Sequence, residues 1–294
     1  MESSGERVDP VPNSLSELGE SPSWDSRHAV LYWVDISRGL VHRYDPGQSA
    51  ITSRSAGRYV SCVVPRKSGG LAITLQHGFY GFDFETGNLS TLSEVERDLK
   101  ENRFNDGKCD PAGRFWAGTM DIKEKRASGA LYRLEGQDTK TVLKGIRISN
   151  GLGWSTDLRT MYFIDTPTRK VSAFDYRLET GEVSNGRTVV DFGGQLGDPD
   201  GMAVDEEGML WVAHWCGYCV TRWNPSTGKL IHRIDVPSSQ VTSCCFGGKD
   251  LNELFITTAR EGVSDTDLAR HPDSGSLFVT RVDTRGQRTY MFDG

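Results

Sequence analysis

The chain has 294 residues, with 34 Lys and Arg against 40 Asp and Glu, which gives a formal net charge of −6. This acidic balance, without any basic cluster, argues against a nucleic-acid or anionic-membrane partner. No apolar stretch approaches the roughly 20 residues of a membrane helix, and the polar residues 1–16 lack the apolar centre of a secretory signal. We therefore expect a cytoplasmic protein, a monomer or weak dimer, with a loose segment 1–16 and one domain over residues 17–294.

Short apolar or alternating runs separated by glycine-rich turns follow one another along the chain, and helical periodicity is scarce. The first runs of this kind, in chain order, are Val30–Val34, Arg114–Ala117, Thr160–Ile164, Leu210–Ala213 and Glu253–Ile256. Each is followed by a second run, at residues 39–44, 129–134, 170–174, 218–223 and 275–280, and 78–82 is another such second run. Many short strands bounded by turn residues predict an all-β protein.

The runs recur with a regular spacing. One equivalent position in each of them gives Tyr32, Ala72, Trp116, Tyr162, Trp211 and Phe255, with gaps of 40, 44, 46, 49 and 44 residues. Repeats of about 40–50 residues with four strands each are typical of β-propeller blades. We therefore predict a six-bladed β-propeller with four antiparallel strands per blade and a central channel. The N-terminal segment is a candidate for the strand that completes the last blade. A β-solenoid, the alternative, has shorter repeats.

Polar residues precede the reference positions at a constant distance. Eleven or twelve residues earlier lie Glu20, Ser61, Asn105, Asn150, Asp200 and Ser243. If these residues occupy the innermost strand of each blade, their side chains converge near the axis of the propeller. Two carboxylates that face each other in a narrow channel repel and are costly to desolvate, which a divalent cation relieves. The alternative is a channel in which water molecules bridge the polar groups.

Oxygen ligands suit Ca²⁺, Mg²⁺ or Mn²⁺, and a small ligand set also admits Zn²⁺ or Fe²⁺. Arg103 lies two residues before Asn105 and therefore on the same face of its strand. A cation beside a metal site suggests an anionic or polyhydroxyl ligand, and the alternative is an ion pair with Glu101 or Asp106.

The motifs around these positions resemble those of the regucalcin, senescence-marker-protein and gluconolactonase family. The matching segments are Leu18–Pro22, Arg103–Lys108 with Asp110–Arg114, Ala117–Met120, Ile148–Gly151, Asp198–Met202 and Thr242–Gly248. They occur in order over nearly the whole chain and in register with the repeats, so the set is specific although each segment alone is weak.

The resemblance implies a propeller with one divalent metal ion, held by Glu20, Asn150 and Asp200, and substrate contacts from Arg103 and Asn105. It also implies hydrolysis of a sugar-acid lactone and tolerance of several metals. Vertebrate members of the family have a substrate-contacting Glu just after the Gly-Thr-Met segment. Here Lys123 takes that position without a gap, and Asp121 or Glu124 replaces it if the loop is rearranged, so the sugar preference stays open.

The resulting hypothesis is a lactonase in which the metal ion polarises the lactone carbonyl and Asp200 acts as general base for water. In the alternative mechanism Asp200 only orients the nucleophile. Alternative functions are a calcium-binding regulator without turnover, a metal-dependent esterase or organophosphate hydrolase, and a scaffold propeller. His214 is a further candidate for contact with the substrate at the channel mouth, with packing in a loop as the alternative.

Overall fold

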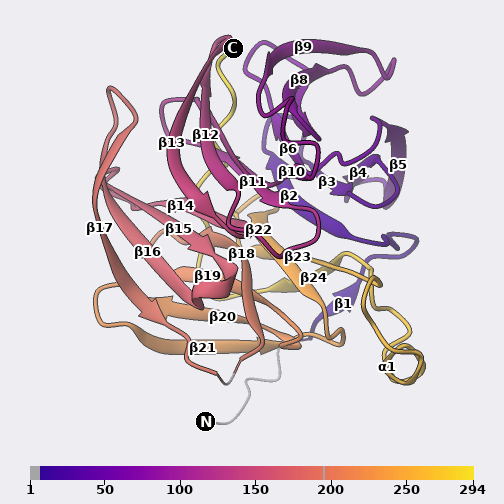
Figure 1. Cartoon of the computed structure of the whole chain (residues 1–294). Coiled ribbons are helices and arrows are strands. Elements are labelled where there is room, and N and C mark those ends of the chain that lie inside the picture. The colour runs from indigo at the N-terminus through magenta and orange to yellow at the C-terminus, as the bar shows by residue number, and fades with distance from the viewer. Residues whose placement is uncertain (1–6, 195) are drawn as a thin grey trace.

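The computed structural model describes residues 7–194 and 196–294, and it is nearly all strand. Six four-stranded antiparallel sheets are arranged as the blades of a propeller, which confirms the predicted fold (Figure 1). The first three blades, each from the axis outward, contain β2 (Gly19–Asp25), β3 (Val30–Asp35), β4 (Leu40–Asp45) and β5 (Ala50–Ser55); β6 (Cys62–Pro65), β7 (Leu71–Leu75), β8 (Gly78–Phe82) and β9 (Leu89–Glu94); and β10 (Asn102–Cys109), β11 (Phe115–Asp121), β12 (Gly129–Glu135) and β13 (Asp138–Ile146).

The last three blades follow the same order. They contain β14 (Ser149–Trp154), β15 (Thr160–Asp165), β16 (Lys170–Arg177) and β17 (Glu182–Asp191); β18 (Asp198–Val204), β19 (Leu210–Trp215), β20 (Cys219–Asn224) and β21 (Lys229–Asp235); and β22 (Val241–Gly247), β23 (Glu253–Thr258), β24 (Phe278–Arg281) and β1 (Asp9–Pro10). A 3₁₀ turn, η1 (Thr166–Thr168), follows β15, and one short helix, α1 (Asp265–Arg270), precedes β24. No helix among the described residues is long and apolar enough to span a membrane.

The N-terminal strand closes the ring by completing the sixth blade. Asp9 and Pro10 pair with Val279 and Phe278 of β24, so the last sheet contains strands from both ends of the chain. Ser14 and Ser16 are buried as well. The structure therefore differs from the expected loose segment 1–16, because its second half takes part in the propeller; residues 1–6 lie outside the described part of the chain.

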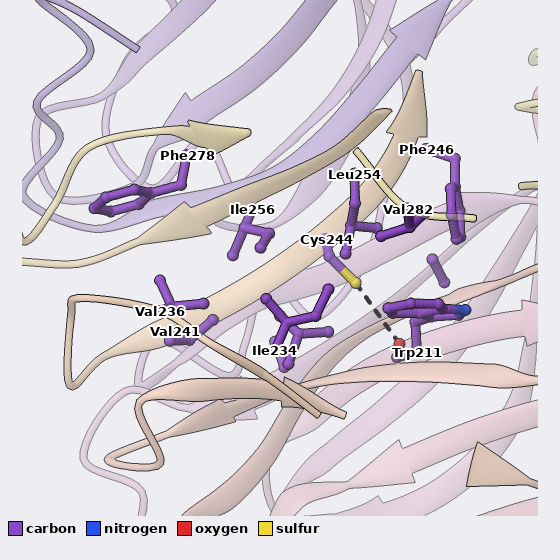
Figure 2. Close-up of a cluster of buried hydrophobic side chains, with 13 residues drawn as sticks. Trp211, Ile234, Val236, Val241, Cys244, Phe246, Leu254, Ile256, Phe278 and Val282 are labelled. Atoms are coloured by element: carbon purple, nitrogen blue, oxygen red, sulfur yellow. Dashed lines mark hydrogen bonds between the residues drawn. The ribbon is translucent and has the colours of Figure 1, made fainter. Parts of the chain in front are cut away.

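The hydrophobic core lies between the blades. Six clusters of buried apolar side chains are present in the described chain, and each draws its members from two neighbouring blades. Figure 2 shows the cluster between the fifth and sixth blades, where Trp211 and Ile234 of one blade meet Cys244 and Ile256 of the next. A single blade cannot bury both of its faces, so this packing requires a closed ring.

The innermost strands of neighbouring blades also contact one another around the whole ring, from β2 through β6, β10, β14, β18 and β22 back to β2. In Figure 1 these strands lie toward the middle of the molecule, and β9, β13, β17 and β21 lie at its periphery. Residues on the inner strands are therefore the ones that meet at the axis.

Candidate active site at the propeller axis

Bulges in the inner strands present polar side chains at the axis. The pairing of β10 with β11 shifts between Phe104 and Gly107, so that Asn105 and Asp106 together oppose a single residue. Similar shifts occur after Ser149 in β14 and after Pro199 in β18. A bulge leaves an extra residue unpaired and changes the direction of its side chain. Asn105, Asn150 and Asp200, three of the ring residues predicted from the spacing, thus lie where the regular ladder is interrupted.

The glycines that follow two ring residues allow the inner strands to approach closely. A Cβ added to Gly151 would lie 2.7 Å from the Cβ of Met202, and one added to Gly201 would lie 2.4 Å from the Cβ of Ser243. Both distances are shorter than real side chains allow. The Asn-Gly and Asp-Gly pairs are therefore packing motifs between adjacent blades as well as site motifs.

Three buried carboxyl groups lie near the axis. Glu20, Asp106 and Asp200 are each 5–6% exposed. Glu20 Oε2 accepts a hydrogen bond from the backbone of Ser21 at 3.0 Å, and Asp106 Oδ1 accepts one from Gly107 at 2.7 Å. Asp200 Oδ1 is buried without a hydrogen-bond partner in the described chain.

Burial raises the pKa of all three groups, and repulsion from neighbouring carboxylates adds to the rise at Glu20 and Asp200. Burial, followed by the charge of Asp106, raises the pKa of Glu20 to about 8. The pKa of Asp200 lies well above its usual range because of burial and the charges of Glu20 and Asp106. Burial also raises the pKa of Asp106. These effects act between groups on β2, β10 and β18, so the three carboxyl groups form one electrostatic unit.

Arg103 and the two asparagines of the ring are joined by hydrogen bonds. Arg103 Nη1 donates to Asn105 Oδ1 at 2.6 Å and to the carbonyl oxygen of Phe104 at 2.8 Å. Asn105 Nδ2 in turn donates to Asn150 Oδ1 at 3.0 Å. Burial lowers the pKa of Arg103 from its usual value, and the carboxylates of Glu20 and Glu124 oppose that shift. The structure therefore brings Arg103, Asn105 and Asn150 together beside the acidic groups.

The ion pairs proposed as an alternative for Arg103 are not formed. Glu101 is paired instead with Lys123, whose Nζ lies 2.8 Å from Glu101 Oε2, and the Lys123 side chain is 65% exposed. Asp121 forms an ion pair with Arg126, whose Nη2 donates a hydrogen bond to Asp121 Oδ1 at 3.0 Å. The hydrogen bonds from Arg126 lower the pKa of Asp121 to about 2.

Of the three candidates at the end of β11 and in the loop after it, Glu124 is the one whose charge influences the buried groups at the axis. Its charge raises the pKa of both Asp200 and Arg103. Glu124 adopts a left-handed conformation with φ of 57°. The Lys123 and Asp121 side chains, which the sequence also suggested for substrate contact, are engaged by Glu101 and Arg126 as described above.

His214 lies inside the fifth blade. Its side chain is fully buried, and Nε2 lies 2.6 Å from Thr221 Oγ1. The ring of Phe192 packs edge-on against it at 5.2 Å between centroids. Burial lowers the pKa of His214 to about 4. Its surroundings are thus those of a neutral core histidine.

A cavity of about 70 Å³ lies on the axis beside this ring. Residues of all six inner strands line it, among them Asp106 and Lys108, together with the C-terminal residues Gln287–Tyr290. Lys108 Nζ donates to the carbonyl oxygen of Met202 at 2.6 Å. Glu20, Asn150 and Asp200 do not line this cavity, so it lies next to the group of ring residues without including them.

The donor set at the axis fits a hard divalent cation. The buried Asp200 oxygen without a partner, the carboxylate of Glu20 and the carboxamide of Asn150 are all oxygen donors, which Ca²⁺, Mg²⁺ and Mn²⁺ prefer. No cluster of three or more His, Cys, Asp or Glu side chains with metal-binding geometry occurs in the described residues.

Two polar residues at the site were not identified as site residues from the sequence. Asp106 was considered only as an ion-pair partner of Arg103, because alternation along a regular strand directs it away from the face of Asn105. The bulge removes that alternation. Thr166 belongs to η1, outside the repeated inner strands, yet it accepts a hydrogen bond from Asn150 Nδ2 at 2.8 Å. No repeat position in the sequence marks it.

Comparison with known proteins gives consistent results. The family described as "SMP-30/Gluconolactonase/LRE-like region" matches residues 18–260. Regucalcin from Danio rerio is 41% identical over 294 residues, which cover 98% of this chain and 99% of the relative. These matches confirm the family resemblance predicted from the sequence motifs.

Solved structures resemble the chain over nearly its full length. A luciferin-regenerating enzyme superposes with a TM-score of 0.93 at 31% identity and covers 99% of this chain and 100% of its own. A protein described as a calcium-binding regucalcin from Agrobacterium tumefaciens gives a TM-score of 0.94 at 27% identity and covers 98% of each chain.

Proposed function

Because the chain belongs to the SMP-30/gluconolactonase/LRE-like family, we propose that it hydrolyses a sugar-acid lactone to the free aldonic acid with the help of one divalent metal ion. The observation that carries the proposal is the buried Asp200 carboxyl group, one oxygen of which has no hydrogen-bond partner, beside two further acidic groups and Arg103. A structural carboxylate at this depth would be fully hydrogen-bonded.

The residues proposed to hold the metal ion are Glu20, Asn150 and Asp200. When bound, a divalent ion offsets the repulsion between the acidic groups and polarises the carbonyl of a lactone as a Lewis acid. Asn150 Oδ1 already accepts one hydrogen bond from Asn105, which leaves a second lone pair on this oxygen.

The same side chains account for the steps of hydrolysis. Asp200 takes a proton from water as the water oxygen attacks the lactone carbonyl carbon. The bond between that carbon and the ring oxygen then breaks, and the ring oxygen takes up the proton as a hydroxyl group. Arg103 and Asn105 hold oxygen atoms of the substrate, the former through charge-assisted hydrogen bonds. In the alternative mechanism Asp200 orients the water without accepting its proton.

The sugar preference is assigned to the loop after β11. With Lys123 and Asp121 engaged in ion pairs, Glu124 is the proposed acceptor for substrate hydroxyl groups at the channel mouth. A carboxylate accepts hydrogen bonds from two neighbouring hydroxyl groups, which suits a polyhydroxyl substrate.

The test is hydrolysis of a panel of lactones by metal-stripped protein. Glucono-, galactono-, xylono- and arabinonolactone would be assayed by acid release, with Ca²⁺, Mg²⁺, Mn²⁺, Zn²⁺ and Fe²⁺ each added back. Activity that returns with a metal ion supports the proposal and identifies the substrate and metal together. Folded, metal-loaded protein that hydrolyses none of the lactones contradicts it, and simple esters and organophosphates in the same assay then test the esterase alternative.

A calcium-binding role without turnover is the second candidate. It is favoured by the similarity to proteins named regucalcin, one of which is described as a calcium-binding protein. Tight Ca²⁺ binding combined with no hydrolysis of any lactone or ester would distinguish this role from the enzymatic one.

A further inference from the structure

We propose that Thr166 is a positioning residue that holds the carboxamide of Asn150 with its oxygen, rather than its nitrogen, toward the axis. The inference rests on the proposed role of Asn150 as a metal ligand. It concerns a hydroxyl group on η1, which belongs neither to the ring of inner-strand residues nor to the loop that faces the substrate.

The evidence is a continuous chain of hydrogen bonds across three blades. Arg103 Nη1 donates to Asn105 Oδ1 at 2.6 Å, and Asn105 Nδ2 donates to Asn150 Oδ1 at 3.0 Å. Asn150 Nδ2 donates to Thr166 Oγ1 at 2.8 Å, and Thr166 Oγ1 donates to the carbonyl oxygen of Pro199 at 2.8 Å. The last acceptor directly precedes Asp200 in the chain.

The groups at the two ends of this series of hydrogen bonds fix which atom donates and which accepts in each bond. A guanidinium group can only donate, and a backbone carbonyl can only accept. Each group between them must therefore accept a hydrogen bond from its neighbour on the Arg103 side and donate one to its neighbour on the Pro199 side. The orientation of both amides follows from this direction.

Asn105 and Asn150 differ in how strongly their amides are held. Asn105 Nδ2 makes a second hydrogen bond to the carbonyl oxygen of Ser149 at 2.9 Å, so Asn105 stays oriented without Thr166. For Asn150 the only acceptor of its amide group in the described residues is Thr166 Oγ1. Loss of that hydroxyl leaves the buried amide nitrogen unsatisfied and removes one of the two hydrogen bonds that favour this amide orientation, the other being the bond that Asn105 Nδ2 donates to Asn150 Oδ1.

The position of Thr166 is itself well fixed. Its backbone N–H donates to the carbonyl oxygen of Ile148 at 3.1 Å, and its carbonyl oxygen accepts from Arg169 at 2.9 Å. Pro167 restricts the backbone of the turn. The hydroxyl group thus links the fourth blade, through Asn150, to the fifth blade, through the residue before Asp200, and sets the spacing of two proposed ligands.

The experiment measures divalent-cation affinity without substrate. Wild type, Thr166→Val, Thr166→Ser and a control variant, Thr280→Val, would be stripped of metal and titrated with Ca²⁺ and Mn²⁺ by calorimetry. Thr280 is a matched control because it is a buried threonine in β24 whose hydroxyl has no partner in the described chain. Thr166→Val, which keeps the shape but loses the hydroxyl, should bind about 10- to 100-fold more weakly, as is typical when a partner of a metal ligand is removed.

Thr166→Ser, which keeps the hydroxyl, should bind within about threefold of wild type, and Thr280→Val should bind like wild type. If Thr166→Val fails to fold without metal, Thr166→Ala removes the same hydroxyl in a smaller side chain and takes its place in the titration. Equal affinities for Thr166→Val and Thr280→Val overturn the inference, as do equal losses for Thr166→Val and Thr166→Ser or a wild type that binds neither cation. Absence of lactone hydrolysis contradicts the proposed activity but leaves this result intact.

Discussion

Asp110 and Asp200 are both deeply buried, but their surroundings are opposite. Asp110 Oδ2 accepts hydrogen bonds from Arg114 Nε at 2.6 Å, Trp116 Nε1 at 2.9 Å and Tyr176 Oη at 2.8 Å. Its Oδ1 accepts from the backbone of Arg114 at 2.9 Å. Asp200 has a buried oxygen with no partner in the described residues and three acidic groups, Glu20, Asp106 and Glu124, whose charges raise its pKa.

The environment of Asp110 recurs in another blade. Asp205 Oδ1 accepts from the backbone of Met209 at 2.9 Å, and its Oδ2 accepts from Trp211 Nε1 at 2.9 Å and Arg222 Nε at 2.8 Å. In both places the sequence reads Asp-Xaa-Xaa-Gly-Xaa-Xaa-Trp. A repeated, fully hydrogen-bonded carboxylate ties a turn to the strand that follows it. The contrast teaches that burial alone does not mark a functional acid; burial without partners does.

The largest effect is expected at Asp200, where a substitution should greatly reduce activity without reducing stability. Asp200→Asn should lower kcat for the lactone by about 10³-fold or more, because it removes the proposed base and one negative ligand. The melting temperature of the metal-free variant should equal or exceed that of wild type, because a repelled buried acid is gone. Steady-state kinetics and calorimetry measure the two effects. A variant that keeps most of its activity with metal bound would show that Asp200 is not the base.

The opposite outcome is expected at the structural carboxylates. Asp110→Asn should lower the free energy of unfolding by about 3 kcal/mol, because a buried arginine loses its charged partner. Asp205→Asn is a second instance of the same change. Denaturant titration measures this effect, and metal affinity serves as its control. Full stability in both variants would mean that these hydrogen bonds do not stabilise the turns.

A pH dependence of intermediate size follows from the raised pKa of Glu20. The folded state keeps the proton up to about pH 8, whereas the unfolded chain releases it near pH 4.5. The folded state therefore binds more protons in this window, and this contribution to the stability of metal-free protein falls as the pH rises from 4.5 to 8. Melting temperatures of wild type and Glu20→Gln across this range measure it.

In that experiment Glu20→Gln should lose this part of the slope, and saturating Ca²⁺ should restore stability to wild type at pH 8, because metal binding favours the deprotonated acid. Identical slopes for the two proteins would argue against a raised pKa at Glu20.

The smallest effects are expected in the loop after β11. Glu124→Gln should raise KM for the lactone about three- to tenfold, because it weakens hydrogen bonds to substrate hydroxyl groups and leaves the other groups of the site in place. Lys123→Ala is the matched control and should change KM less than twofold, because an exposed ion pair contributes little. A larger effect from Lys123 than from Glu124 would reverse the assignment of the two residues.

Much of the site follows from the repeat. The constant step from Trp116 back to Asn105, and from Trp211 back to Asp200, identified polar residues that the structure places on inner strands near one another. The spacing could not identify Asp106, because its direction depends on a bulge, nor Thr166, because its hydroxyl meets Asn150 from a turn outside the repeat.

The sequence by itself determined the fold class, the number of blades and the polar character of the axis, because repeated strands with one apolar face can bury those faces only against neighbouring copies. Only the tertiary structure decided which candidate acid near the end of β11 influences the buried groups electrostatically, how the amides are oriented, and where the chain's first strand pairs. These features depend on hydrogen bonds and charges between residues far apart in sequence, and local pattern carries no information about their distances.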